Sequence, residues 1–232
     1  LADDVDVDGD GRNDVACLTE NQLLWFRNPD WTPTVIDNVE LHDIEVVDFD
    51  QDGNMDIIWR NQSAFGGSGK MLICYRQYRK GFWKKTQMPC PEGEGLKVAD
   101  VNGDGKPDIV VNGSWYENTG KPGKAEWRER TYTRSWRWPH VSISVGDVNG
   151  DGRPDIILTP SEKAGQKYRI SWFEAPKTFG GEWQEHIVDG EAECVHHFCA
   201  AADMDNDGSI DIVTAEMHQG ADPDEVKIYR NG

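Results

Sequence analysis

Groups of aspartate residues recur along this chain, and their spacing is typical of a binding loop for a hard cation. The pattern Asp-x-Asp/Asn-x-Asp-Gly-x-x-Asp occurs five times, at residues 6–14, 48–56, 100–108, 147–155 and 203–211, called loops 1 to 5 below. Carboxylates at positions 1, 3 and 5 can converge on one point, and glycine at position 6 permits the sharp turn that aims them inward. All of these donors are oxygen atoms, which favours Ca²⁺ over zinc or copper.

We expect each loop to hold one Ca²⁺ through positions 1, 3, 5, 7 and 9. Position 7 offers its backbone carbonyl, so its side chain is free to vary, and the aspartate at position 9 closes the shell. The predicted metal ligands are Asp6, Asp8, Asp10, Arg12, Asp14, Asp48, Asp50, Asp52, Asn54, Asp56, Asp100, Asn102, Asp104, Lys106, Asp108, Asp147, Asn149, Asp151, Arg153, Asp155, Asp203, Asp205, Asp207, Ser209 and Asp211.

The loops have two other possible interpretations. An EF-hand would carry a carboxylate at position 12, where these loops have Cys17, Trp59, Val111, Leu158 and Thr214. A set of acidic turns without metal is the simpler alternative, but the glycine at position 6 and the aspartate at position 9 recur in all five copies. Carboxylates about 4–5 Å apart repel by roughly 4 kcal/mol at an effective dielectric near 20. A bound cation should therefore stabilise the fold.

The segments around each loop predict short β-strands. A β-branched run follows the loop, as in Ile109-Val110-Val111, then comes an aromatic strand such as Trp25-Phe26, and a tryptophan such as Trp183 opens a fourth segment. The first aspartates of successive loops are 42, 52, 47 and 56 residues apart. Four short antiparallel strands in each repeat of this length are typical of a propeller blade, so the fold class is predicted to be all-β, a β-propeller of four-stranded blades.

The aspartate loops, supported by the aromatic strands, resemble the FG-GAP or VCBS repeats, the calcium-binding blades of integrin-α-like propellers. The resemblance runs from Asp6 to about Asn231, although Phe65-Gly66-Gly67 is only part of a Phe-Gly…Gly-Ala-Pro signature. It implies a propeller, commonly seven-bladed, with Ca²⁺ in the hairpin between the first two strands of each blade. We expect residues 1–232 to be a single domain, cut from a longer propeller at both ends, with a five-bladed ring as the alternative.

The composition of the chain excludes some classes of binding partner. The formal net charge of −18 argues against nucleic acid, which needs a basic surface. The sequence has no apolar stretch near the ~20 residues that span a bilayer, so no membrane insertion is expected. The resemblance implies a monomer that is secreted, periplasmic or on the cell surface. The five cysteines leave at least one thiol free, with Cys194–Cys199 or Cys74–Cys90 as candidate disulfides.

Histidines gather in the segments that enter the first strand of a repeat. His42, His140, His196 and His197 lie six or seven residues before the first aspartate of a loop. In a propeller these segments converge near the central opening. Together with Lys97, the four histidines are the candidate catalytic acids and bases.

The same face supplies candidate ligand-binding residues, namely Glu45, Glu94, Arg137, Trp138 and His218. A tryptophan can stack on a sugar, and an arginine can bind a carboxylate through two hydrogen bonds. The expected function is the binding of a carbohydrate or protein ligand in a polar pocket. The alternative is a polysaccharide lyase that removes a proton next to a uronate carboxylate. A purely structural role for these residues is the third interpretation, and zinc at Cys194, His196, His197 and Cys199 is disfavoured by the ligand spacing.

Overall fold

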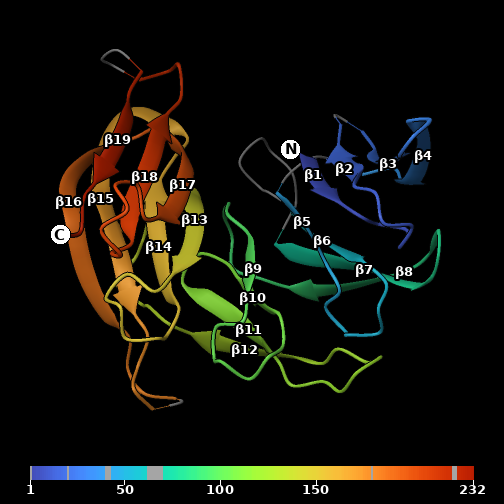
Figure 1. Ribbon diagram of the computed structural model, residues 1–232. Coiled ribbons are helices and arrows are strands. Elements are labelled where there is room, and N and C mark those ends of the chain that lie inside the picture. Colours follow the sequence, from blue (N-terminus) through green and yellow to red (C-terminus); the bar gives the residue numbers. More distant parts are fainter. Residues whose placement is uncertain (1, 20, 40–42, 62–69, 179, 221–223) are drawn as a thin grey trace.

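The computed structural model describes residues 2–19, 21–39, 43–61, 70–178, 180–220 and 224–232. In these ranges the chain forms five separate antiparallel sheets, whose strands follow one another in chain order (Figure 1). The predicted all-β class is confirmed, and four of the five sheets have the predicted four strands.

Each sheet corresponds to one sequence repeat. Sheet 1 contains β1 (Ala2–Val5), β2 (Asp14–Leu18), β3 (Leu23–Arg27) and β4 (Thr32–Asp37). Sheet 2 contains β5 (Ile44–Val47), β6 (Asp56–Asn61), β7 (Met71–Arg79) and β8 (Phe82–Pro89). Sheet 3 contains β9 (Lys97–Ala99), β10 (Asp108–Val110), β11 (Ser114–Asn118) and β12 (Trp127–Thr131). Sheet 4 contains β13 (Val141–Gly146), β14 (Asp155–Pro160), β15 (Lys163–Glu174) and β16 (Gln184–Cys194). Sheet 5 contains β17 (His196–Ala202), β18 (Asp211–Glu216) and β19 (Val226–Tyr229).

The aspartate loops connect the first strand of each sheet to the second. Every second strand begins at the position-9 aspartate of its loop, as β10 does at Asp108. In sheets 2, 3 and 4 the β-branched residues that follow are completely buried, namely Ile57, Ile109 and Ile156. In these three sheets a neighbouring sheet lies on each side, so burial is nearly continuous along the second strand, whereas it alternates along β2 in sheet 1.

The five sheets stand side by side in an arc and are joined through their first strands (Figure 1). The strand β5 contacts β1 and β9, and β13 contacts β9 and β17. The first strands therefore form the inner edge of the arc. Apolar side chains fill the spaces between the sheets, for example Ile57 and Tyr75 between sheets 1 and 2, and Tyr132 and Phe173 between sheets 3 and 4.

Two further expectations concern cysteines and membranes. All five cysteines are free thiols, so neither suggested disulfide is formed. The described part of the chain contains no helix long and apolar enough to cross a membrane.

Candidate functional site

The five aspartate loops share one hydrogen-bond pattern. In loop 2, the Asp48 carboxylate accepts the amide of Asp52 (3.0 Å) and that of Gly53 (2.8 Å), while Asp52 accepts the amide of Asn54 (2.9 Å). Equivalent bonds occur in the other four loops. The glycine at position 6 has a positive φ in every loop, +91° in Gly53, which explains why this position is glycine.

The position-9 aspartate anchors its loop to the third strand of the same sheet. Asp108 is completely buried and accepts the amide of Asn118 (2.8 Å) through Oδ1 and that of Val101 (3.0 Å) through Oδ2. Burial raises the pKa of the Asp108 carboxyl to about 7 and that of the Asp56 carboxyl to about 8. This anchoring role was not predicted from the sequence.

The loops fit a hard divalent cation. In loops 1, 2 and 5, three carboxylates each place an oxygen within 4.8 Å of the other two, and the groups are Asp6 with Asp8 and Asp10, Asp48 with Asp50 and Asp56, and Asp203 with Asp205 and Asp211. Asp50 is only 2% exposed, and in the described chain its Oδ1 and the Oδ2 of Asp56 have no hydrogen-bond partner. Buried carboxylate oxygens without donors are costly unless they are paired or bind metal. Oxygen-only donors suit Ca²⁺.

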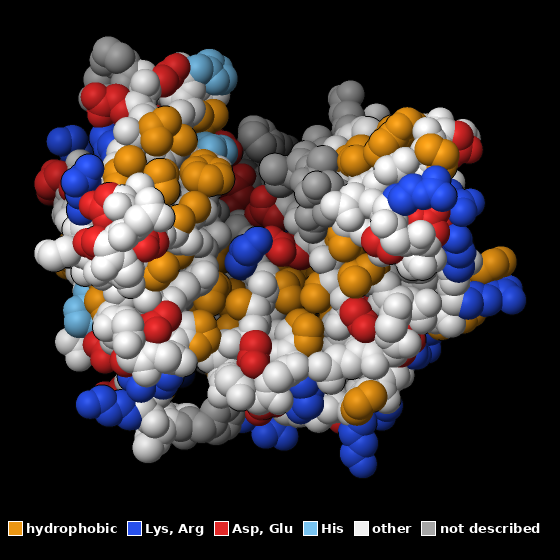
Figure 2. Space-filling view, in the orientation of Figure 1, with side chains coloured by type: hydrophobic (Ala, Val, Ile, Leu, Met, Phe, Trp, Pro, Cys, Tyr) orange, Lys and Arg blue, Asp and Glu red, His pale blue; other side chains and the backbone are white. Residues whose placement is uncertain are grey.

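A second group of titratable side chains lies at the inner edge of sheets 2 to 5. His197 on β17 places Nε2 3.1 Å from Glu162 Oε1, in the turn between β14 and β15. His140, before β13, places Nδ1 3.6 Å from Oε2 of Glu94, before β9. Asp43, before β5, completes the set, and these five residues are called the central cluster. Figure 2 shows acidic side chains gathered in the hollow at the middle of the molecule.

The pKa values of Asp43 and Glu162 are both raised, in part by the charge of Glu94. Burial, followed by the charge of Glu94, raises the pKa of Asp43 to about 6. The pKa of Glu162 is also raised, first by burial and then by Glu94, whose carboxyl group is within hydrogen-bond reach. The charge of Glu94 therefore disfavours the ionised form of both neighbouring carboxyl groups.

A buried arginine fixes the segment that carries Glu94. The guanidinium of Arg60, 1% exposed, donates to the carbonyl oxygens of Glu94 and Gly95 and to Asn112 Oδ1. The Gly95 amide then donates to Asp43 Oδ2 (2.8 Å). Glu94 and Asp43 are thus positioned by the same segment.

Glu162 has an unusual backbone. Its φ is +73°, a left-handed conformation that costs a non-glycine residue about 1 kcal/mol or more. The preceding residue, Ser161, is buried, and its hydroxyl donates to Glu94 Oε2 (3.2 Å). Strained residues cluster at functional sites, so this turn supports a functional role for Glu162.

The family model of the FG-GAP-like repeat matches four overlapping stretches, residues 6–59, 48–111, 100–158 and 147–214. The chain belongs to the FG-GAP-like repeat family. Each match begins at the first aspartate of a loop and ends within or directly after the second strand of the next sheet. This confirms the resemblance predicted from the loops, while cation binding by these FG-GAP-like repeats stays a prediction.

Other comparisons add little to the family assignment. No protein with a curated description matches the chain. Among solved structures, the chain is similar to the V. cholerae biofilm matrix protein Bap1, with 18% identity and a TM-score of 0.48. The match covers 84% of this chain and 30% of that one, so the chain spans less than a third of that protein's length.

The FG-GAP-like repeats bring three of the predicted site residues together, namely Glu94, His140 and His197. His42 lies outside the described residues. His196 is completely buried, with Nδ1 2.9 Å from Thr214 Oγ1 and Nε2 3.7 Å from Glu216 Oε1. Burial lowers the pKa of His196, which makes it a neutral core residue at neutral pH.

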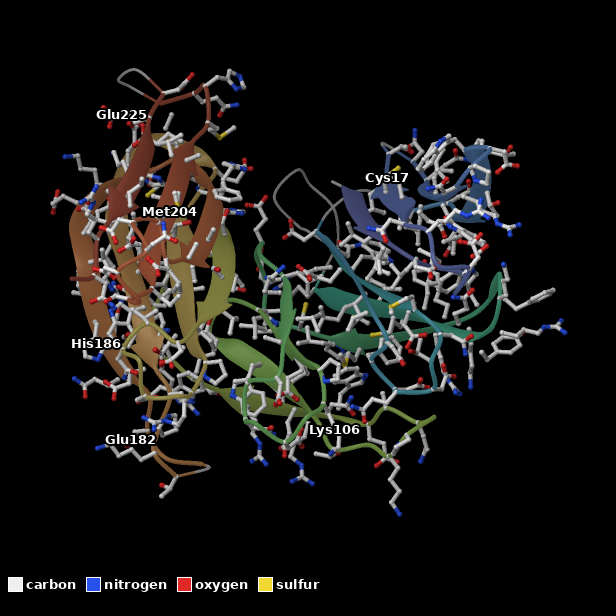
Figure 3. All side chains as sticks on the ribbon, viewed as in Figure 1. Cys17, Lys106, Glu182, His186, Met204 and Glu225 are labelled. Carbon is white, nitrogen blue, oxygen red and sulfur yellow. The ribbon has the colours of Figure 1, made fainter. Side chains whose placement is uncertain are left out.

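The other predicted site residues have different surroundings. Lys97 forms an ion pair with Glu45 (2.8 Å). Trp138 is half-buried and stacks on Tyr168, with ring centroids 5.8 Å apart, and the neighbouring Arg137 is exposed. His218 is exposed in the turn that follows β18. In Figure 3, His186 lies on the outer strand β16.

Sequence reasoning missed Asp43 and Glu162. Asp43 directly follows a histidine that was selected, so its position was a usable signal. Glu162 lies in a hairpin turn with no repeated pattern, and only the folded path of that turn brings it to His197.

Proposed function

We propose that this chain is the repeat region of an extracellular β-propeller whose loops bind Ca²⁺ and whose central cluster binds a neutral carbohydrate. The observation that carries this proposal is the convergence of carboxyl and imidazole groups from four different sheets at the inner edge of the arc. Polar groups that converge from several elements are a common feature of ligand sites.

The chemistry of the cluster favours hydroxyl groups as ligands. Carboxylates accept hydrogen bonds, and imidazoles can donate or accept them, so both suit the alternating donors and acceptors of a sugar. The cluster has three carboxyl groups, and the guanidinium of Arg60 is occupied by protein oxygens. A uronate carboxylate would therefore enter a site of its own charge, which favours a neutral sugar.

An aromatic surface adjoins the cluster. The Trp138 indole donates to the carbonyl of Ser161 (2.9 Å), the residue before Glu162. The stacked Trp138 and Tyr168 rings therefore lie next to a cluster residue in the fold. Aromatic faces beside polar groups suit the apolar face and the hydroxyl edge of a sugar ring.

A lyase acting on uronate glycans is the second candidate. The observation in its favour is the pair of Glu162 and His197, an acid and a base in contact beside a strained backbone. Basic side chains suited to a uronate, such as Arg134 and Lys177, line a cleft of about 500 Å³ between sheets 3 and 4, which no residue of the central cluster lines. The acid–base pair and these cations are thus in different places, which ranks the lyase second.

Calorimetric titration with neutral and uronate oligosaccharides, chosen from a glycan array, tests the proposal. We expect a neutral glycan to bind, and Glu162→Gln to weaken binding about tenfold or more because a charge-assisted hydrogen bond is worth about 1.5–3 kcal/mol. The matched control is Glu174→Gln, since Glu174 also pairs with a histidine, His186 (2.9 Å), but on the outer strand of sheet 4.

Two results would overturn the carbohydrate proposal. One is the absence of neutral glycan binding across the array, and the other is equal binding by the Glu162→Gln and Glu174→Gln proteins. A rise in ultraviolet absorbance from unsaturated ends on uronate glycans, lost in Glu162→Gln, would establish the lyase instead.

A further inference from the structure

The charge at loop position 3 varies together with the charge at the end of the third strand. The strand-end residue is the one that precedes the amide bound by the position-9 aspartate, which defines the same place in all five sheets. An aspartate at position 3 accompanies an arginine, in the pairs Asp8 and Arg27, Asp50 and Arg76, and Asp205 and Arg230. An asparagine accompanies a glutamate, in the pairs Asn102 and Glu117, and Asn149 and Glu174.

The arginines contact the position-3 carboxylates directly. Arg27 Nε lies 2.6 Å from Asp8 Oδ2, and Arg230 Nη1 lies 3.5 Å from Asp205 Oδ2. In loop 2, Arg76 forms an ion pair with Asp50 through Nε and reaches Asp52 Oδ2 with Nη2 at 2.8 Å. Loops 1, 2 and 5, which contain four aspartates each, therefore each have an arginine of the protein paired with a loop carboxylate.

Loops 3 and 4 are organised differently. The side-chain oxygen of Asn102 accepts the amide of Asp104 (2.9 Å), and Glu117 pairs with Arg130 (2.6 Å) on the next strand. A basic side chain reaches these loops from position 7, where Lys106 lies 3.1 Å from Asp104. Loop 4 repeats this arrangement, with Arg153 paired to Asp151.

We propose that Arg27, Arg76 and Arg230 are built-in counter-ions, each of which balances the position-3 carboxylate of its loop and lowers that loop's affinity for a divalent cation. The balancing of the carboxylate concerns the protein without bound cation. Only the lowering of cation affinity rests on the proposed calcium binding. The five loops thus fall into two classes, one with an arginine on a position-3 carboxylate and one with an asparagine at position 3 and no such arginine.

The geometry of loop 2 explains why the competition is partial. Asp50 is buried, and its Oδ2 is occupied by Arg76, whereas its Oδ1 has no hydrogen-bond partner in the described chain. A divalent cation can bind Oδ1 while the arginine remains on Oδ2. The two positive charges then share one carboxylate and repel each other across a poorly solvated site, which weakens cation binding without preventing it.

The first test compares Arg76→Met with Lys84→Met, which removes the same charge from the paired position on the neighbouring strand β8. In chelator, we expect Arg76→Met to melt at a lower temperature than both the parent protein and Lys84→Met. In a calcium titration followed by melting temperature, Arg76→Met should respond at about tenfold lower free calcium, within the coupling range of contacting charges. Equal behaviour of the two variants in both measurements would overturn the proposal.

The second test moves the pair to another loop. In chelator, Asn102→Asp should lower the melting temperature, and Glu117→Arg added to it should recover most of the loss, whereas Glu117→Arg alone should not stabilise the protein. A double variant no more stable than the sum of the single changes would overturn the counter-ion role. If calcium changes the melting of no variant, the proposed calcium binding fails, while these comparisons in chelator still decide the role of the arginines.

Discussion

Asp43 is the residue whose titration has the clearest expected effect. Its pKa is raised from 3.8 to about 6, so the folded protein binds this proton more tightly than the unfolded chain does. The contribution of this proton to stability is fully present below about pH 4 and is lost as the pH rises through 6. Above that pH, the charge of Asp43 opposes folding. Asp43→Asn should therefore raise the free energy of unfolding at pH 7.5 by about 1–2 kcal/mol, after allowance for partial exposure.

Thermal unfolding across pH 4 to 8 measures this effect. The asparagine keeps a side-chain oxygen for the Gly95 amide, so the variant should match the parent protein near pH 4 and exceed it above pH 6. A gain of the same size at every pH would mean that the titration of Asp43 is not its source.

The sequence predicted which kinds of residue form the central cluster better than it predicted their contacts. Glu94, His140 and His197 were selected because they share an offset from the loops, and they do meet. Successive residues of a strand point to opposite sides, so only one of His196 and His197 could reach the cluster. Which one does so depends on the register of β17, which the sequence pattern does not specify.

Side-chain amides at or near the end of the third strand connect neighbouring sheets. Asn118 Nδ2 donates to the Phe49 carbonyl at position 2 of the loop in the preceding sheet (2.7 Å), and Gln77 and Asn231 make the same contact with their preceding loops. Asn118 is 2% exposed. Asn118→Ala should lower the free energy of unfolding by about 1–3 kcal/mol because it leaves a buried carbonyl without its donor.

Denaturant unfolding checks this prediction against Asn28→Ala. The side chain of Asn28 donates to the carbonyl of Asn13 in its own repeat (3.1 Å), and this hydrogen bond is exposed. Asn28→Ala should therefore lower the free energy of unfolding clearly less than Asn118→Ala does. A similar decrease in the free energy of unfolding for the two variants would show that the hydrogen bond between sheets contributes no more to stability than the exposed one.

Strand type and order were predictable, and strand length was not. The β-branched run after each loop predicted the buried second strands, and Trp127 and Trp183 do mark the start of fourth strands. The hairpin of β15 and β16 is longer than the repeat suggests and contains three register shifts. Such irregularities arise from local packing and carry no periodic signal.

At the scale of the whole molecule, the loops are part of the contact system between sheets. Gln51 of loop 2 donates to the Gly105 carbonyl of loop 3 (2.8 Å), and Lys80 of sheet 2 pairs with Asp8 of loop 1 (2.7 Å). Eighteen of the 42 acidic residues lie in the five loops. A cation in each loop would remove repulsion at the places where neighbouring sheets meet, so cation binding should stabilise the arc as a unit.

Thermal unfolding with and without calcium tests whether cation binding stabilises the arc. A ligand at a hundredfold excess over its Kd stabilises by about 2.7 kcal/mol for each site, so removal of calcium with a chelator should lower the melting temperature by at least about 10 °C. Added Ca²⁺ should restore it, and native mass spectrometry should detect the bound ions. An unchanged melting temperature in strong chelator, together with the mass of the metal-free chain in excess calcium, would contradict the account.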